Sequence, residues 1–306
     1  MLRKGEKYLF RLVYHYRSMG PVGIGFTAFP KPVRKEILRM KKAPRQKYPL
    51  VTELTEAEHI GMVREIFSTI TGKYDFLNHL LSLGRDIVWR RSAVKKMRFF
   101  RTYRFLDVGS GTADLAIVAT QRHPCIRVTG VDFVRQMVDL GRSKIEKRHL
   151  SDKIRLVTSD ALDLPFPDNS FDVTGIAFGI RNIPNKIRAL REMMRVVVPG
   201  GQVMVLEMTF PRNRLIQGIY RIYLNRMLPN LARPFSPNPA AYSYLADSIT
   251  HFPTPEGFVR LMDEAGLNQV QKHCLTLGIT HLYIGTKPIS PRPIQSTGTV
   301  KPPSSR

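Results

Sequence analysis

The sequence predicts an α/β protein whose doubly wound sheet has about seven mostly parallel strands, and three observations support this. Short apolar, β-branched runs alternate with segments whose apolar residues recur at helical spacing. Right-handed helical crossovers between such runs produce a parallel sheet. A glycine-rich turn follows the first run, at the position where such sheets bind ligands.

Each element is predicted from its own pattern. Five runs are read as buried strands, at 104–108, 127–131, 154–158, 171–177 and 202–207. The intervening segments 115–121, 134–147 and 186–197 are read as helices, and Pro199-Gly200-Gly201 turns the last of them into the next strand. Further helices are expected at 215–228, 240–250 and 255–265, then strands near 270–275 and 281–286. An inserted helical cap is expected within this part of the chain.

Composition divides the chain into three parts. Residues 1–50 hold thirteen Lys and Arg, two acids and scattered Pro and Gly, so we expect a basic, poorly ordered extension. A globular domain follows over 51–287, and the Pro-, Ser- and Thr-rich stretch 288–306 is expected to be a disordered tail. The two cysteines, Cys125 and Cys274, lie far apart and predict neither a disulfide framework nor a metal site.

The formal charge of +24 indicates an anionic partner, either nucleic acid or an anionic membrane surface, or else simply a basic surface. No apolar run reaches 18 residues, so no membrane-spanning helix is predicted. The basic N-terminal segment is compatible with a mitochondrial presequence, but it holds one serine, Ser18.

The turn after the first strand reads Gly109-Ser110-Gly111-Thr112-Ala113-Asp114. Gly109 and Gly111 allow close backbone approach to a ligand, beside the free N–H groups of a helix N-terminus. A dinucleotide fingerprint would have a third glycine where Asp114 stands, and that carboxylate would repel a pyrophosphate. The Asp114 carboxylate could instead accept a hydrogen bond from the ammonium group of a sulfonium-bearing amino acid. The presence of Asp114 therefore argues against a nicotinamide oxidoreductase and favours S-adenosylmethionine as the cofactor.

Acidic residues end the next two strands. Asp132 follows Gly111 by 21 residues and is placed to accept the hydroxyls of a ribose, or to cap the following helix. Asp160, followed by Ala161, ends the third strand in the same way. The carboxyl ends of parallel strands converge on one crevice, so these acids are expected to meet at the same ligand.

Several blocks then match a known family. The chain resembles the ubiquinone/menaquinone biosynthesis C-methyltransferases over roughly residues 60–287, with matching blocks at 73–78, 81–84, 89–91, 164–172, 177–182 and 242–249. The blocks FGIRN and YSYLADSI are specific to that family. Two departures are present: Ala113 stands where the family often has glycine, and Ala177 where it often has serine.

The resemblance implies a Rossmann-like class I methyltransferase that transfers a methyl group from S-adenosylmethionine to a ring carbon of a polyprenyl quinol. It also implies cofactor contacts at Thr112, Asp132, Asp160 and Ala161. Demethylmenaquinol is the favoured substrate, and a 2-methoxy-6-polyprenyl-benzoquinol of ubiquinone biosynthesis is the alternative. No metal is expected.

Catalytic and substrate residues are assigned by position. Arg181 remains protonated, so it is expected to stabilise a phenolate or hold a water, while a salt bridge to a strand-end acid is its structural alternative. Asn182 is expected to orient the substrate oxygen. The resemblance implies four substrate-pocket residues, with plain packing as the alternative: Tyr74, Asn78, Tyr244 and Asp247.

A lipid substrate requires contact with a membrane. The segment 215–228 has apolar residues at helical spacing with Arg214, Arg221 and Arg226 interspersed, as in a helix lying at an anionic interface, or a cap helix packed on the sheet. The enzyme is therefore expected in the cytoplasm at the inner membrane, or alternatively in a mitochondrial matrix, and a homodimer is compatible with the family.

Two rival functions are weaker. A nucleic-acid methyltransferase would fit the charge, but Ala177-Phe178-Gly179-Ile180 replaces the Asn/Asp-Pro-Pro-aromatic motif of enzymes that methylate base nitrogens. The basic excess is also concentrated outside the core, so no nucleic-acid partner is expected. A non-catalytic scaffold of a quinone-synthesising complex is disfavoured by the retained acids and Arg181.

Overall fold

A computed structural model describes residues 48, 54–70, 74–232, 238 and 240–289, all within the unit Arg45–Arg306. The predicted N-terminal extension lies outside the described residues except for Tyr48, and so does the predicted tail except for Pro288 and Ile289. Everything below refers to the described residues.

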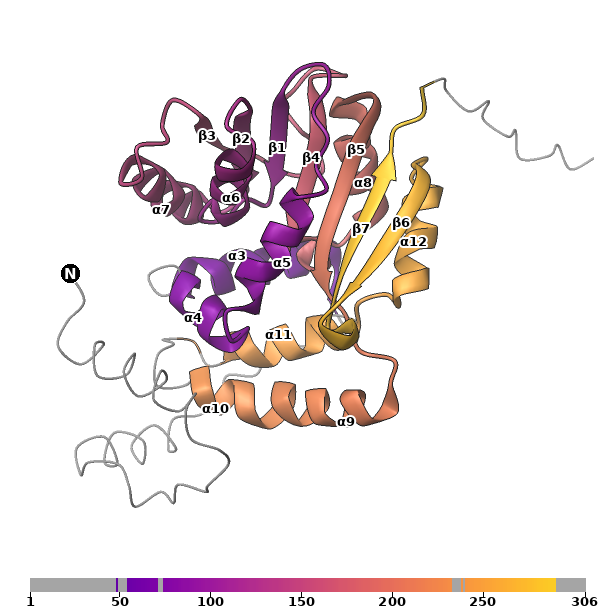
Figure 1. Ribbon diagram of the computed structural model, residues 1–306. Helices are drawn as coiled ribbons and strands as arrows, with labels where there is room; N and C mark the ends of the chain where they lie inside the picture. The colour runs from indigo at the N-terminus through magenta and orange to yellow at the C-terminus, as the bar shows by residue number, and fades with distance from the viewer. Residues whose placement is uncertain (1–47, 49–53, 71–73, 233–237, 239, 290–306) are drawn as a thin grey trace, which may run out of the picture. The chain divides into compact units, whose positions relative to one another are not determined.

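Seven strands form one sheet in the order β3-β2-β1-β4-β5-β7-β6, which confirms the predicted doubly wound, mostly parallel architecture (Figure 1). The strands are β1 (Arg104–Val108), β2 (Arg127–Asp132), β3 (Ile154–Thr158), β4 (Phe171–Ala177), β5 (Val197–Met208), β6 (Asn268–Leu275) and β7 (Thr280–Thr286). The first five run parallel, and β7 runs antiparallel to both of its neighbours. The order reverses between β1 and β4, and this reversal creates the crevice in which such sheets bind ligands.

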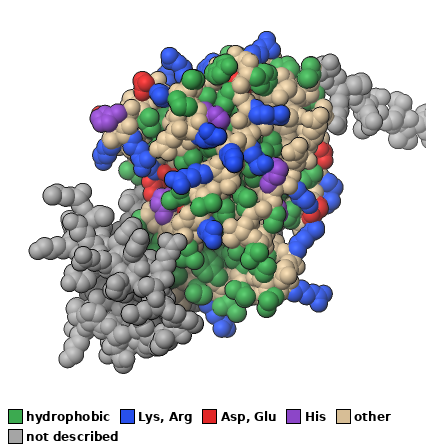
Figure 2. Space-filling model, viewed as in Figure 1, with side chains coloured by type: hydrophobic (Ala, Val, Ile, Leu, Met, Phe, Trp, Pro, Cys, Tyr) green, Lys and Arg blue, Asp and Glu red, His purple; other side chains and the backbone are tan. Residues whose placement is uncertain are grey.

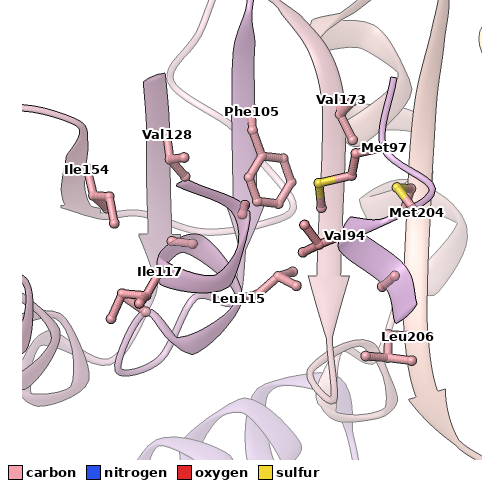
Figure 3. Packing of buried hydrophobic residues seen from close by; sticks show 14 of the residues in the cluster. Val94, Met97, Phe105, Leu115, Ile117, Val128, Ile154, Val173, Met204 and Leu206 are labelled. Carbon is pink, nitrogen blue, oxygen red and sulfur yellow. The ribbon is translucent and has the colours of Figure 1, made fainter. Parts of the chain in front are cut away.

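Helices cover both faces of the sheet because alternate strand residues point to opposite faces. Phe105 of β1 packs with α5 (Arg85–Val94), α6 (Asp114–Arg122) and α7 (Arg135–Glu146), and Figure 3 shows this side of the core. The next residue, Leu106, belongs to the second cluster, which contains residues of α8 (Lys186–Val196) and α12 (Pro255–Glu264). Both strand residues are fully buried.

A helical cap lies at the carboxyl ends of the parallel strands (Figure 1). It consists of α3 (Glu56–Ile70), α4 (Tyr74–Leu81), α9 (Arg214–Ile222), a π-helical turn (Tyr223–Met227), α10 (Leu228–Ala232) and α11 (Ala240–Thr250). A third apolar cluster, including Val63, Leu77, Leu224 and Ile249, holds these helices together. The cap thus combines the predicted insertion with two helices that precede the first strand.

Most predicted boundaries agree with the structure within one or two residues, and two elements differ more. The helix expected over 215–228 is interrupted by the π-helical turn, where the Tyr223 hydroxyl donates to the Leu81 carbonyl of α4. Strand β5 begins at Val197, before the Pro-Gly-Gly turn, because β4 pairs with Val197 and resumes its register only at Gln202. Gly200, with φ of +80°, lies within this irregular stretch and its amide donates to the Lys287 carbonyl.

Asp172, at the start of β4, is fully buried and holds the turn that leads into β1. Its carboxylate accepts from the backbone amides of Arg101, Thr102 and Tyr103 at 3.2, 2.9 and 2.7 Å. We expect Asp172→Asn to lower the free energy of unfolding by about 2–3 kcal/mol, since charge-assisted bonds are lost without relief of burial. Urea denaturation measures this, with exposed Asp152→Asn as the control. Equal midpoints for the two variants would contradict the role of Asp172.

Candidate active site

The loop between β1 and α6 has a backbone shape that its glycines make accessible. Gly109 and Gly111 have φ values of +61° and +52°, in the left-handed region that glycine adopts without strain. The Ser110 amide donates to the Val131 carbonyl at 2.9 Å, which ties the loop to the end of β2. The loop therefore approaches the crevice with its backbone, as the sequence predicted.

Asp132 joins this loop to the next helix. One carboxylate oxygen accepts from the Gly111 amide at 2.8 Å and the other from the Val134 amide at 2.9 Å. Burial raises the pKa of Asp132, although these backbone hydrogen bonds lower it. Each oxygen keeps a second lone pair, so the carboxylate could still accept hydroxyl groups from a ligand.

Helix α7 packs closely against the same loop. A Cβ added at Gly141 would lie 2.5 Å from Leu156 Cδ1 and 3.2 Å from the Gly111 carbonyl oxygen. A larger residue at position 141 would therefore push α7 away from β3 and from the loop. Glycine at position 141 therefore allows α7 to pack directly against the loop.

A cavity of about 310 Å³ opens at these strand ends. Six of the predicted site residues line this cavity: Gly109, Gly111, Asp132, Asp160, Ala161 and Asn182. Its remaining walls are largely apolar and include Ile60, Val63 and Phe67 of α3, Phe133 and Ile183. A cavity with acids at the strand ends and apolar walls suits a ligand that is polar in one part and apolar in another.

Arg181 lies in the 3₁₀ turn Ile180–Asn182 after β4, and its side chain bonds to residues outside the cavity lining or to backbone. Its Nη1 donates to Glu207 Oε1 at 2.5 Å and to the Phe178 carbonyl at 2.7 Å. Glu207 lies near the end of β5 and is fully buried, so the pair is the strand-end salt bridge that the sequence left as an alternative. Arg181 is not among the residues that line the cavity, whereas the neighbouring Asn182 is.

Tyr244 lies behind Asn182 rather than in the cavity lining. Its hydroxyl donates to Asn182 Oδ1 at 3.0 Å and lies 2.9 Å from His59 Nε2. These three side chains come from the 3₁₀ turn, α11 and α3, and all are buried.

Thr112 and Asp114 belong to a polar network beside the loop. The Thr112 hydroxyl donates to Asp75 of α4, and Lys144 of α7 pairs with both Asp75, at 2.6 Å, and Asp114. Neither Thr112 nor Asp114 is among the cavity-lining residues. The network connects α4, the loop and α7, so its visible role is to hold the loop in place.

The same network continues to His79, Asp86 and Asp114, which lie close enough together to surround a cation. Both acids already form ion pairs with the Arg90 guanidinium, whose Nη1 lies 2.5 Å from Asp86 and whose Nη2 lies 4.0 Å from Asp114. Burial raises the pKa of Asp86, but hydrogen bonds from His79 and Ser82 and the charge of Arg90 outweigh it and lower that pKa.

Of the other predicted substrate residues, neither Asn78 nor Asp247 is among the residues that line the cavity. Asn78 is half-buried in α4. Asp247 accepts from His251 Nδ1 at 3.0 Å on α11. The side chain of Tyr74, the first residue of α4, lies outside the described part of the chain.

Several residues at the site were not anticipated. Arg64 lines the cavity with its guanidinium over the Phe133 ring, 5.8 Å from the ring centroid. His59 and Lys144 reach their partners from α3 and α7. No local motif marks these positions, and the helix that carries His59 and Arg64 was not among the predicted elements. Only Phe133, directly after Asp132, could have been inferred from the strand pattern.

Solved structures share this architecture. A SAM-dependent methyltransferase from Thermotoga maritima superposes with a TM-score of 0.51 at 20% identity, covering 73% of this chain and 98% of that one. Phosphoethanolamine N-methyltransferase 2 from Haemonchus contortus, solved with S-adenosyl-L-methionine, has a TM-score of 0.50 at 15% identity and covers 65% of this chain and 52% of that one. The fold is thus that of the SAM-dependent methyltransferases.

Sequence comparison narrows the class. The family model described as the ubiE/COQ5 methyltransferase family matches residues 52–287. Ubiquinone/menaquinone biosynthesis C-methyltransferase from Geotalea daltonii is 42% identical, covering 74% of this chain and 96% of its own length. Demethylmenaquinone methyltransferase from Thermus thermophilus is also 42% identical, over 73% and 100%. The chain belongs to the ubiE/COQ5 methyltransferase family, which confirms the resemblance, and it is an enzyme of the methyltransferase class.

The Arg181–Glu207 pair leads to a stability prediction. Arg181→Ala should lower the free energy of unfolding by about 3–5 kcal/mol, since it leaves a buried carboxylate without its partner. Adding Glu207→Gln should recover part of that loss, because the uncompensated charge disappears. Urea unfolding of both single variants and the double variant completes the cycle. Strictly additive losses would show that the two side chains are not coupled.

Proposed function

We propose that this enzyme transfers the methyl group of S-adenosylmethionine to a ring carbon of a polyprenyl quinol, with demethylmenaquinol as the preferred acceptor. The observation that carries the proposal is the shared cavity, which joins the glycine loop and Asp132 to Asn182 between apolar walls. Relatives named demethylmenaquinone methyltransferase support the choice of acceptor. Relatives named for both quinones keep the methoxybenzoquinol as the second candidate.

In this proposal, the cofactor is held by the backbone at Gly109 and Gly111, by the carboxylate of Asp132 and by Asp160 and Ala161. S-adenosylmethionine supplies an electrophilic methyl group when it is bound. Asp132 fits the ribose part because both its oxygens are already oriented by backbone amides and retain acceptor capacity. Thr112 and Asp114 support the loop through Asp75 and Lys144.

The chain's contribution to the reaction is positioning and electrostatics. The apolar walls from α3 and Phe133 exclude water and orient a flat ring, which aligns the reacting carbon. Asn182 lines the cavity, and in this proposal its amide contacts the substrate oxygen. Arg181 anchors the Ile180–Asn182 turn by pairing with Glu207, so it acts on a phenolate by holding Asn182 in position rather than through unpaired charge.

The function is tested by supplying methyl-labelled S-adenosylmethionine with each demethylated quinol in detergent. We expect label in the ring of menaquinol, and less in the methoxybenzoquinol. Asp132→Asn should weaken cofactor binding by at least about tenfold in calorimetry, because a carboxylate acceptor is lost. Asp139→Asn, on the outer surface of α7, is the matched control. Label in neither quinol would refute the proposal, and label transferred to RNA instead would favour a nucleic-acid substrate.

Membrane contact is proposed through α9. Leu215, Ile219 and Ile222 recur along one face of this helix and are 74%, 62% and 53% exposed. Met227 and Leu231 extend the exposed apolar residues beyond α9. Hydrophobic side chains gather at the lower edge of Figure 2, where Figure 1 places α9. No helix of the described residues is long and apolar enough to cross a membrane.

The opposite face of the α9 segment is already occupied. Tyr220 and Leu224 are buried in the cap cluster, so the exposed residues are not needed for packing. Arg214 and Arg221 lie on the same helix and suit anionic headgroups. A lipid quinol could thus reach the enzyme from a bilayer surface, at the cytoplasmic side in bacteria as the sequence suggested.

Vesicle binding tests this contact. The triple variant Leu215→Ser, Ile219→Ser and Ile222→Ser should bind vesicles of phosphatidylglycerol and phosphatidylcholine at least about tenfold more weakly, because three apolar side chains no longer enter the interface. Sedimentation with the vesicles measures the bound fraction. The control triple variant Val88→Ser, Phe100→Ser and Leu140→Ser removes comparably exposed side chains elsewhere. Equal binding by the two triple variants would contradict the role of α9.

A further inference from the structure

A linear chain of hydrogen bonds leads from the cavity wall into the cap. Asn182 lines the cavity, its Oδ1 accepts from the Tyr244 hydroxyl at 3.0 Å, and that hydroxyl lies 2.9 Å from His59 Nε2. The three residues are 9%, 5% and 4% exposed. Bonds as buried as these fix the orientation of each group, because a polar atom left unpaired there is costly.

The chain has a definite direction. A tyrosine hydroxyl has one hydrogen, and Tyr244 donates it to Asn182. The Tyr244 oxygen must then accept from His59, which places a hydrogen on His59 Nε2. With Asn182 Oδ1 engaged as an acceptor, the part of this amide left to face the cavity is its NH₂ group, which can only donate.

The surroundings keep His59 and Tyr244 in the protonation states that this direction requires. Burial and the nearby charge of Lys186 lower the pKa of His59, so the ring is neutral at neutral pH and has a single N–H. Burial raises the pKa of Tyr244, and the charges of Asp247 and Glu207 raise it further while Arg181 lowers it. The hydroxyl therefore keeps its proton. Lys186 itself donates to the Ile183 carbonyl at 2.9 Å, so its amine is bonded within the turn.

The opposite direction would present different chemistry to the substrate. A hydrogen on His59 Nδ1 would make Nε2 an acceptor for the Tyr244 hydroxyl. The Tyr244 oxygen would then accept from the Asn182 amide, whose Oδ1 would face the cavity. An oxygen in that position would repel a phenolate and stabilise the protonated phenol. The position of the hydrogen on His59 therefore determines whether Asn182 presents a hydrogen-bond donor or an acceptor to the cavity.

We propose that His59 and Tyr244 are positioning residues that hold the Asn182 amide as a fixed hydrogen-bond donor to the substrate's oxygen. The inference rests on the proposed function, because a quinol methylated on carbon gains nucleophilicity as its oxygen becomes a phenolate. Asn182 donates to that oxygen before and after methyl transfer and neither gains nor loses a proton. The donor is preorganised, so little reorganisation is needed when charge develops.

The direct test measures the pKa of a bound phenol and needs no turnover. 4-Nitro-1-naphthol is titrated by absorbance with the enzyme and S-adenosylhomocysteine. Burial between the apolar walls raises the pKa of the bound phenol equally in every variant, so the difference between variants isolates the hydrogen bond. The phenol pKa should be about one pH unit lower in the wild type than in Tyr244→Phe and His59→Leu, the effect of a hydrogen bond to a charged oxygen. His59→Gln should keep the lower pKa, because its side-chain amide can still donate to the Tyr244 oxygen.

Kinetics provide the second readout. His59→Leu should lower kcat about tenfold with the KM for S-adenosylmethionine unchanged, and His59→Gln should remain within about twofold of the wild type. Tyr103→Phe, a half-exposed tyrosine away from the cavity, is the control. Thermal melts followed by circular dichroism set a temperature at which every variant is folded.

The outcomes separate the two proposals. The same phenol pKa in the wild type, Tyr244→Phe and His59→Leu would overturn the orienting role of His59 and Tyr244. A shift that His59→Gln fails to retain would also overturn it. Failure to methylate either quinol, with the phenol result as expected, would refute the proposed substrate and leave the fixed donor established.

Discussion

The carboxylate of Asp132 is the constraint on which the rest of the site depends. It binds the Gly111 amide with one oxygen and the Val134 amide with the other, and so fixes the glycine loop relative to the start of α7. That arrangement is possible because β1 and β2 are adjacent and parallel, with Val108 opposite Val131. The loop and the acid therefore reach the same edge of the sheet, where the cavity opens.

Two further layers support this arrangement. On one side, Lys144 pairs with Asp75 and Asp114, and this network connects the loop to α4. On the other, Glu207 holds Arg181 behind the turn that carries Asn182. These ion pairs thus lie behind the residues that line the cavity, and the cavity walls themselves are mostly apolar. The polar side chains in the walls are concentrated at a few positions, among them Asp132, Asp160 and Asn182.

The cap helices add a cavity wall and an exposed apolar surface to a sheet that is common to many methyltransferases. Helices α3 and α11 bring His59 and Tyr244 to the back of Asn182, and α3 also supplies apolar residues to the cavity wall. Helix α9 packs inward through Tyr220 and exposes Leu215 and Ile219. One set of helices therefore closes the cavity, orients a polar group in its wall and presents an apolar surface to the outside.

The sequence by itself determined the sheet, the loop and the strand-end acids. Continuous apolar runs and helical spacing are local patterns, so the predicted strands are found in the structure, with only the start of β5 clearly misplaced. Parallel topology forces the strand ends together, so Gly109, Gly111, Asp132, Asp160 and Ala161 line one cavity. The family blocks likewise pointed to Asn182. Ala113 is a departure that the structure accommodates, with φ of +69° at the start of α6.

Only the tertiary structure decided which side chains of these motifs line the cavity and which ones bond to partners behind it. The sequence placed Arg181 and Asn182 together, but Glu207, 26 residues away, draws the arginine behind the wall and leaves the asparagine in it. Tyr244 became a support for Asn182 because His59, 185 residues away, lies beside its hydroxyl. Such partners are distant in the chain: Glu207 lies on β5 and His59 on α3, and no local motif marks either position. Local patterns report burial and periodicity, whereas the direction of a hydrogen bond depends on what the fold brings next to it.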